Sequence, residues 1–575
     1  MSFTDIDKSQ TVKYSNSLKF SLLSILLGLS VWLLYVRYGK GPVLPDELKA
    51  GVANEILVAV YDMKHRIPEN LPNHIRYLSM KWKDADSRLD TADLKEKLSK
   101  SGDLLLTIEI WPVKHKNPLD ELLEGEYDAK IKLLARFVAG RNDVMLRFLP
   151  EMEVPVQLLP WQYQSPDKYI NAFNYFAALL KKSAPGVKMV WSPAGYPGDS
   201  EFWPGPDHVD LISITVGGKS EKSSKAFPLD TGLTSTVLKS KIHRMRFMDK
   251  AILILAEGIK INPPEIAPML KEVKNQADSF KNTIYSAEHF DKGSKQVISR
   301  KKLAIGVYDP RKILLKEPSV STEHLFTDWG EIQRGDFSRN FHEVIKRRHD
   351  VIVTMEPWRD TTNVEDPFAL QNTIKGKYDR EIIKLYHIIS NSGQQVYLRW
   401  AHEMEIPIHR YSWQSQSPVD YINSFRYFMK FKQEASQILS VWGPAGDRGS
   451  VDWYPGDDVV DYISIAIYGL PDKNITDEDK QESFGTVFQR KSYRMRFINK
   501  PFFITEFGVK GKEAYKKKWL EGAAETIRGH KEIFGICYFN LFDNPKVWGD
   551  IKAPDWSITK DTFIKFCRSV EQNDK

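Results

Sequence analysis

Cysteine is scarce in this sequence, with only Cys537 and Cys567 among 575 residues. Two cysteines cannot build the disulfide framework that stabilises small secreted domains, and they leave the redox compartment open. The net charge is only +7 for this length, and no nucleic-acid motif accompanies it, so we expect no nucleic-acid partner. The hydrophobic content of 42% is ordinary and sufficient for two sizeable globular domains.

Complete cofactor motifs are also lacking. His402 and Glu403 could open a zinc-binding HExxH motif, but position 406 is Ile406 instead of histidine. The segment VGGKS (216–220) ends like a phosphate-binding loop, but Ser213 stands where that motif requires its first glycine. We therefore expect neither a metal ion nor an organic cofactor.

One long run without charge, FSLLSILLGLSVWLLYV, covers the 17 positions from 20 to 36. This length is at the lower limit for a membrane-spanning helix. Trp32, Tyr35 and Tyr38 lie near its far end, where aromatic rings favour the membrane interface. Because no small-x-small cleavage site follows, we predict an uncleaved transmembrane anchor over residues 20–38 rather than a signal peptide. Residues 1–19 form a tail before it, and the flanking cations do not decide the orientation.

The remainder of the chain repeats itself. WQYQSPDKYINAFNYF (161–176) recurs as WQSQSPVDYINSFRYF (413–428), with 11 of 16 positions identical. Other segments recur in the same order: EGEYD (124–128) as KGKYD (375–379), VWSPAG (190–195) as VWGPAG (441–446), and HRMRF (243–247) as YRMRF (493–497). This conserved order indicates a duplicated domain instead of a short solenoid repeat. We place domain one at 52–290, a basic linker at 291–302 and domain two at 303–570.

Within each domain, short apolar runs alternate with helix-like segments. In domain two the runs are LAIGVYD, DVIVTME, QVYLRW, ILSVW, YISIAIY, PFFITEF and FGICYFN. They are too short for helices, and periodic segments such as YDREIIKLYHIIS lie between them. This pattern predicts the α/β class, with two tandem (β/α)8 TIM barrels. A doubly wound sheet is the alternative, but no glycine-rich nucleotide-binding turn follows the first strand.

Polar residues gather where the predicted strands of domain two end, and such ends carry the active site of a parallel barrel. They are Glu356, Trp358, Arg399, His402, Glu403, Tyr468, Glu506 and Asn540. Glu403 and Glu506 close two different strands, so their carboxyl groups can meet at one rim. Hydrolysis of a glycosidic bond needs such a pair, one group as proton donor and the other as nucleophile or base. Trp358, Trp413, Trp453 and Trp556 are available to stack on sugar rings, and Asn540 is a further candidate for substrate binding.

Domain two resembles glycoside hydrolase family 26. The resemblance rests on RWAHEME with a tryptophan ten residues beyond the glutamate, VWGPAG, YPGDDVVDYISIAIYG and FITEFG, and it extends to the tail YFNLFDNPKVWGDIKAPDWSI. That family contains endo-β-mannanases with some β-glucanases and β-xylanases. It has a (β/α)8 fold and a retaining mechanism, so the resemblance implies both for domain two.

The resemblance also implies roles for individual residues. Glu403, on strand four, is the expected acid/base, and Glu506, on strand seven, is the expected nucleophile. His402, Tyr468 and Arg399 are expected to support them, while Trp413 and Trp442 fall on binding positions. The family often continues HEMN, whereas Glu405 replaces the amide here, which leaves the choice of substrate open.

Domain one resembles the family more weakly. Glu151 matches Glu403, and Glu257 matches Glu506 after a shift of one residue. Pro150 replaces His402, Gly217 or a neighbour replaces Tyr468, and NTIYSAEHF (282–290) is the candidate for the last strand. Because both tuning groups are lost, we expect a degenerate site with a structural or glycan-binding role.

The sequence therefore predicts a membrane-anchored retaining endo-β-glycoside hydrolase that acts on a mannan or glucan type of polysaccharide. Its domains would lie outside the cytoplasm, in the periplasm or at the cell surface. One alternative is a transglycosylase, which would use the same residues. Another is a glycan-binding or scaffolding subunit of a membrane complex for polysaccharide synthesis or export.

Overall fold

The computed structural model describes residues 56–61, 74–84, 91–100, 102–112, 117–154, 157–216, 240–257, 302–432, 435–469, 481–545 and 552–572. Residues 52–575 form one compact unit that contains both domains. The predicted tail, anchor and candidate last strand of domain one lie outside the described residues, as does the linker up to position 301. Among the residues that are described, no helix has both the length and the apolar character needed to cross a membrane.

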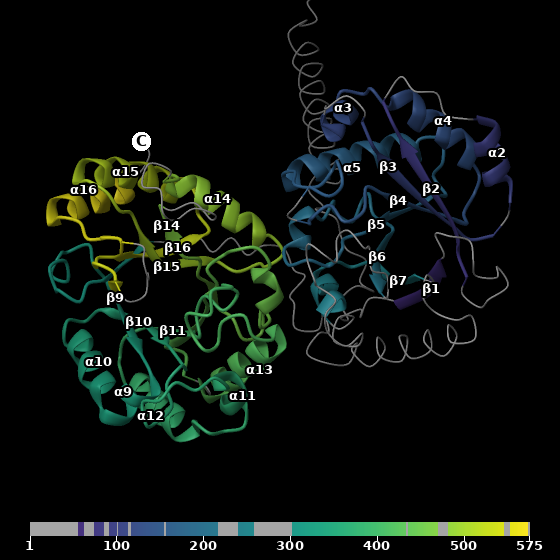
Figure 1. Cartoon of the computed structure of the whole chain (residues 1–575). Coiled ribbons are helices and arrows are strands. Elements are labelled where there is room, and N and C mark those ends of the chain that lie inside the picture. Colours follow the sequence, from purple (N-terminus) through teal and green to yellow (C-terminus); the bar gives the residue numbers. More distant parts are fainter. Residues whose placement is uncertain are drawn as a thin grey trace, which may run out of the picture. The chain divides into compact units, whose positions relative to one another are not determined.

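Domain two alternates strands and helices along its sequence (Figure 1). Its strands are β8 (Ala304–Tyr308), β9 (Thr322–Thr327), β10 (Asp350–Met355), β11 (Val396–Trp400), β12 (Ile438–Trp442), β13 (Tyr462–Ile463), β14 (Ile467–Tyr468), β15 (Phe502–Gly508) and β16 (Ile533–Phe539). Its α-helices are α9 (Trp329–Arg334), α10 (Asp336–Lys346), α11 (Ala369–Ile374), α12 (Asp379–Ser390), α13 (Pro418–Met429), α14 (Phe484–Arg494), α15 (Glu513–Gly529) and α16 (Lys560–Glu571).

The sheet of domain two closes into a barrel. All its paired strands are parallel, β8 pairs with both β9 and β16, and β13 pairs with both β12 and β15. Both β13 and β14 pair with β15, so these two short strands share one position in the barrel. The nine strands therefore fill eight positions around the ring. The predicted (β/α)8 barrel is confirmed here, with β11 as strand four and β15 as strand seven. The run YISIAIY divides into β13 and β14, and β9 was not among the predicted strands.

Domain one follows the same plan with fewer strands. Its strands are β1 (Ile56–Tyr61), β2 (Arg76–Trp82), β3 (Leu104–Ile110), β4 (Val144–Phe148), β5 (Lys188–Trp191), β6 (Leu211–Val216) and β7 (Ala251–Glu257). Its α-helices are α2 (Thr91–Ser99), α3 (Pro118–Leu123), α4 (Asp128–Val138) and α5 (Pro166–Lys181).

The described strands of domain one leave no gap between strand seven and strand one. In a (β/α)8 barrel the last strand lies between strand seven and strand one, but β1 pairs directly with β7 along six residues. A bridge between Val60 and His74 links β1 to the start of β2. The described part of domain one is therefore a seven-stranded ring, which corrects the expectation of eight strands.

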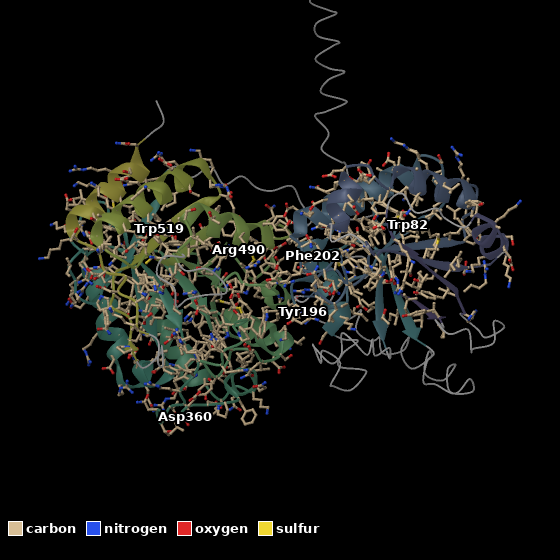
Figure 2. All side chains as sticks on the ribbon, turned by 45° about the horizontal axis from the view of Figure 1, so that its top comes forward. Trp82, Tyr196, Phe202, Asp360, Arg490 and Trp519 are labelled. Carbon is tan, nitrogen blue, oxygen red and sulfur yellow. The ribbon has the colours of Figure 1, made fainter. Side chains whose placement is uncertain are left out.

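Repeated residues begin repeated helices. α5 and α13 each start at the proline of a QSP segment, where the fixed φ of proline suits the first helical position. In domain two the preceding Ser417 caps the helix by accepting from the backbone N–H of Asp420. Apolar residues of these helices then pack on the outer face of each sheet. Figure 2 shows Trp82 among the packed side chains of domain one and Trp519 among those of domain two.

The interior of the second barrel is layered. An apolar layer contains Ile352, Tyr397, Val441, Tyr462, Phe503 and Cys537. Two residues further along four of these strands lie Thr354, Arg399, Ser464 and Thr505, all buried. His324 joins this polar layer by hydrogen bonds to the Thr354 hydroxyl (2.7 Å) and the Thr505 carbonyl (3.2 Å). Residues two positions apart on a strand point to the same side of the sheet. The barrel interior therefore has an apolar layer followed by a polar layer directly below the strand ends.

Candidate active site

Glu403 lies in a strained turn just beyond strand four. β11 ends at Trp400, and both Ala401 (φ 42°) and Glu403 (φ 52°) adopt left-handed backbone conformations. The backbone N–H of Glu403 donates to the Gly443 carbonyl (2.8 Å), and the Gln414 side chain donates to the Glu403 carbonyl (3.1 Å). Glu403 therefore lies outside the regular alternation of side chains along β11. Such strain persists only where surrounding contacts hold the chain in place.

Glu506 is held by groups from two other strands. Arg399 on β11 forms an ion pair with Oε1 of Glu506, and the Tyr468 hydroxyl on β14 donates to Oε2 (3.1 Å). Arg399 is fully buried and Glu506 is 5% exposed. A buried carboxylate needs such a partner because desolvation penalises an isolated charge. The structure thus brings the predicted trio Arg399, Tyr468 and Glu506 together.

A glycine makes room for this arrangement. A Cβ atom at Gly443 would lie 2.1 Å from Nε of Arg399, which is closer than any real contact. The corresponding residue of domain one is Ser192. There Arg147, the counterpart of Arg399, donates to the Thr107 hydroxyl (3.0 Å). Domain one therefore keeps the arginine in another hydrogen-bonding arrangement.

The surroundings of Glu403 favour its acid form. Burial, followed by the negative charge of Glu506, raises the pKa of Glu403 to about 7. One carboxyl group is paired with arginine, whereas the other resists ionisation, so the two lie in different electrostatic environments. This difference is what an acid/base and a nucleophile require.

Glu356 is a third carboxyl group at the same rim, and the sequence assigned it no role. It directly follows β10 and is partly buried. Burial raises the pKa of Glu356 to about 8, with the charge of Glu506 as the next cause. Its Oε1 lies 3.9 Å from Nε2 of His402. Burial, followed by the charge of Arg399, lowers the pKa of His402 well below its usual range, so both groups are neutral at pH 7.

Most of the candidate sugar-binding tryptophans are buried. Trp413 and Trp442 are 0% exposed, Trp556 is 1% exposed and Trp453 is 7% exposed. The expectation that they stack on sugars is revised, because buried rings offer no face to a ligand. Only Trp358 of this group is partly exposed.

The buried candidates instead support the site. The Trp413 indole donates to the His402 carbonyl (2.7 Å), and the ring of Trp556 packs at 4.6 Å from that of Tyr468. Asn540, also predicted to bind substrate, is 0% exposed. Its amide donates to Asp309 (3.0 Å) and accepts from the Ile558 backbone (3.0 Å). Asn540 thus links the end of β16 to the residue after β8 and to the segment before α16.

The unusual Glu405 has a structural role. Its Oε1 accepts from the backbone N–H groups of Gly446 (2.9 Å) and Asp447 (3.2 Å) and from the Ser450 hydroxyl (2.7 Å). In domain one, Glu153 accepts in the same way from Gly195 (2.9 Å) and Tyr196 (3.0 Å). The second glutamate of each EME segment thus fixes the loop that follows the fifth strand.

Domain one retains the backbone of this site. Glu151 is left-handed (φ 61°), its N–H donates to the Ser192 carbonyl (2.8 Å), and the Trp161 indole donates to the Pro150 carbonyl (2.7 Å). The backbone of Glu257 pairs with Tyr61 at the end of β7. The side chain of Glu257 and the whole of Gly217 lie outside the described part. In the described residues of either domain, no cluster of three or more His, Cys, Asp or Glu could hold a metal ion.

No protein-family profile matches the chain. Beta-1,3-xylanase TXYA of a Vibrio species is 30% identical over 147 residues, which are 24% of this chain and 28% of that protein. Endoglucanase H of Acetivibrio thermocellus is 25% identical over 251 residues, 41% of this chain and 25% of its own length. The chain thus spans little more than a quarter of these relatives. Both are named as enzymes that hydrolyse glycosidic bonds.

Solved structures give a similar set of names. A GH26 β-mannanase from Bacteroides ovatus, BoMan26A, is 14% identical with a TM-score of 0.37. The matched region covers 48% of this chain and 91% of the mannanase chain. A ruminal GH26 endo-β-1,4-mannanase is 13% identical with a TM-score of 0.31 and covers 52% of this chain and 69% of its own. At this level of superposition neither neighbour carries an argument about function.

Gly443→Ala tests the space beside Arg399. The added methyl group displaces the guanidinium from Glu506, so we expect a loss of about 2–4 kcal/mol in unfolding free energy, close to the cost of breaking a buried ion pair. Chemical denaturation measures this loss. Gly522→Ala on α15 is the matched control, because its Cβ meets nothing within 4 Å and alanine favours helix. Equal stability of both variants would contradict the packing described.

Glu356→Gln tests the raised pKa of that carboxyl group. The folded pKa of about 8 exceeds the usual value, so the unfolded chain ionises first and wild-type stability falls as pH rises from about 4.5 to 8. The glutamine variant does not titrate there. Thermal unfolding is measured for both proteins at pH 5 and at pH 8.5. The stability of the variant minus that of the wild type should be larger at pH 8.5 than at pH 5. A constant difference would show that Glu356 ionises normally.

Proposed function

We propose that domain two is a retaining endo-acting β-glycoside hydrolase for a β-linked polysaccharide of the mannan or glucan type. One observation carries the proposal: the glutamates at the ends of strands four and seven interact with each other, yet their surroundings differ. Glu506 is paired with Arg399, whereas Glu403 has a raised pKa. The names of the sequence relatives support the same class of reaction.

The reaction would proceed in two displacements. Glu403 donates its proton to the leaving glycosidic oxygen while the Glu506 carboxylate attacks the anomeric carbon. The glycosyl–Glu506 ester forms and the glycosidic bond breaks. Glu403, now ionised, removes a proton from water, which attacks the same carbon and frees Glu506. Arg399 and Tyr468 orient the attacking carboxylate, and the neutral His402 adds no charge that would stabilise premature ionisation of Glu403.

The proposal includes the predicted anchor at 20–38. An anchor there would hold both domains at a membrane, outside the cytoplasm, where a polysaccharide substrate is met. A transglycosylase would use the same two glutamates and pass the glycosyl unit to a sugar instead of water. Oligosaccharides longer than the substrate would distinguish transglycosylation from hydrolysis.

Hydrolysis of β-mannan, mixed-linkage β-glucan, cellulose and β-1,3-xylan tests this function. We expect oligosaccharide products from at least one, with kcat/KM falling above about pH 7 as Glu403 loses its proton. Glu403→Ala should lower kcat by roughly 10²–10⁴-fold. Glu151→Ala, at the matching position of domain one, is the control and should have wild-type activity. Absence of cleavage by the wild type, or equal loss in both variants, would refute the proposal.

A second candidate function is glycan binding by domain one. A cavity of about 460 Å³ is lined by Trp111, Asn117, Gln157 and Gln164, together with leucine and proline side chains. Trp111 stands two residues after Glu109, as Trp358 stands two residues after Glu356, and both rings are partly exposed. An aromatic ring beside amide groups is a suitable surface for a sugar.

Trp111→Ala tests this binding in the full chain. Removing the ring should weaken retention in gels that contain the polysaccharide which domain two cleaves, by at least about tenfold in Kd. Glu403→Ala is made in the same chain so that the glycan stays intact during the measurement. Retention that is unchanged by Trp111→Ala would exclude a binding role for this cavity.

A further inference from the structure

The two barrels contact each other through copies of the same two elements. One is the RMRF segment, residues 243–247 in domain one and 493–497 in domain two. The other is the fifth-strand loop, residues 192–205 in domain one and 443–456 in domain two. Each RMRF segment contacts the fifth-strand loop of the opposite domain.

The contacts are reciprocal almost atom for atom. Arg246 donates through Nη2 to the carbonyls of Val451 (2.7 Å) and Asp452 (3.3 Å). Its counterpart Arg496 donates through Nη2 to the carbonyls of Ser200 (2.7 Å) and Glu201 (3.3 Å). The same residue type thus binds the same pair of loop carbonyls in both directions.

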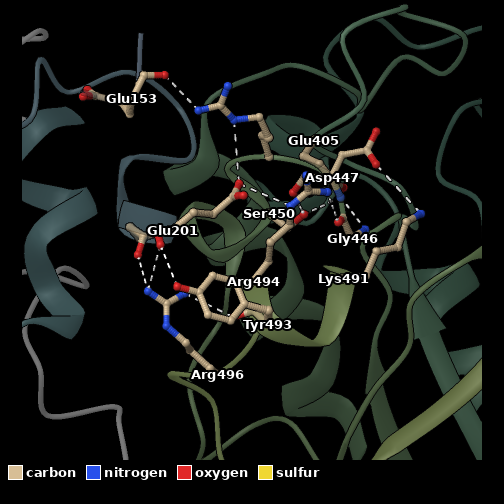
Figure 3. Close-up of polar contacts among 12 residues, drawn as sticks. Glu153, Glu201, Glu405, Gly446, Asp447, Ser450, Lys491, Tyr493, Arg494 and Arg496 are labelled. Carbon is tan, nitrogen blue, oxygen red and sulfur yellow. Dashed lines mark hydrogen bonds and ion pairs between the residues drawn. The ribbon is translucent and has the colours of Figure 1, made fainter. Parts of the chain in front are cut away.

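The neighbouring residues repeat the pattern. His243 donates to the Asp452 carbonyl (2.6 Å), and Arg244 forms an ion pair with the Asp452 carboxylate (2.8 Å). Tyr493 donates to the Glu201 carbonyl (3.0 Å), and Arg494 forms an ion pair with the Glu201 carboxylate (3.2 Å). Figure 3 shows Glu201 facing Tyr493, Arg494 and Arg496.

Apolar and backbone contacts follow the same symmetry. The rings of Phe247 and Phe497, the last residues of the two segments, lie 5.7 Å apart. At the loop tips, Gly198 (φ 90°) and Gly449 (φ 79°) are both left-handed. A Cβ on Gly449 would lie 2.9 Å from Pro197, and one on Gly198 would lie 2.9 Å from Arg448. One chain therefore contains an interface of the isologous kind found in two-fold symmetric dimers.

The loop that domain one contacts is also part of the candidate site. The Gly443 carbonyl, at the start of this loop, accepts from the N–H of Glu403 (2.8 Å). Glu405 holds the middle of the loop through Gly446 and Ser450, and Asp452 follows within the same short helix as Ser450. A continuous set of contacts thus leads from the RMRF segment of domain one to the backbone of Glu403.

We propose that domain one is a built-in partner subunit that positions the acid/base of domain two. His243, Arg244 and Arg246 are positioning residues, because they fix the fifth-strand loop and do not contact reacting atoms. This inference rests on the proposed function of domain two. This role would account for the retention of the RMRF segment and the fifth-strand loop in domain one. It does not require the site of domain one to be active.

The symmetry of the interface provides a matched pair of variants. Arg246→Ala releases the loop of domain two, whereas Arg496→Ala removes the same hydrogen bonds from the loop of domain one. Both should lower the unfolding temperature of the full chain to a similar extent. Only Arg246→Ala should lower kcat, by about tenfold or more, because a displaced catalytic group costs rate steeply. The alkaline limb of its pH profile should also shift, and Arg246→Lys should restore part of the rate.

A second readout keeps the inference separate from the proposed function. Hydrogen exchange at residues 443–456 should accelerate in Arg246→Ala and stay at the wild-type rate in Arg496→Ala, whether or not a substrate is found. If either arginine variant fails to fold, His243→Phe and Tyr493→Phe remove one reciprocal donor each. Equal effects of the two partners on kcat and on loop exchange would overturn the inference and leave domain one a simple stabilising contact.

Discussion

The buried ion pair between Arg399 and Glu506 affects the ionisation of the three titratable groups around it. The negative charge of Glu506 contributes to the raised pKa values of Glu403 and Glu356, and the positive charge of Arg399 contributes to the lowered pKa of His402. Burial is the largest cause of each of these shifts and the charge pair adds to it, so the charged forms of all three neighbouring groups are disfavoured. The geometry of the pair depends on Gly443, since any side chain there would occupy the space of the guanidinium.

The duplicated domain shows which features depend on that pair. Domain one keeps the left-handed turn at Glu151, the supporting Trp161 and an arginine at position 147. It has a serine where domain two has Gly443, and its arginine bonds a threonine hydroxyl. The backbone scaffold has thus been retained while the electrostatics differ. Conservation of the fifth-strand loops in both copies fits their shared role at the interface between the barrels.

Much of the fold followed from the sequence because its signals were local. Internal repeats indicated a duplicated domain, and short apolar runs predicted every strand of the second barrel except β9, whose residues TEHLFT are mostly polar. Within β9, His324 faces the barrel interior, where it bonds the Thr354 hydroxyl and the Thr505 carbonyl, and no local pattern reveals such partners. The seven-stranded ring of domain one was likewise invisible, because it results from the pairing of β1 with a strand about 190 residues later.

The candidate site was predictable in part. Strand-end positions identified Glu403, Glu506, Arg399 and Tyr468, and the structure places the last three in direct contact. The tryptophans were misjudged because a single sequence does not distinguish an exposed ring from a buried one. The importance of Gly443 and the structural role of Glu405 were missed because each depends on a residue more than 40 positions away in the sequence. Gly443 makes room for Arg399, and Glu405 accepts from Gly446.

The most direct measurement of the central claim is covalent trapping with an activated 2-deoxy-2-fluoro glycoside of the β-linked sugar that the protein cleaves. The account predicts a stable glycosyl adduct on the peptide that contains Glu506, identified by mass spectrometry, and its absence in Glu506→Gln. An adduct on Glu403 or Glu356, or turnover with inverted anomeric configuration and no adduct, would contradict it.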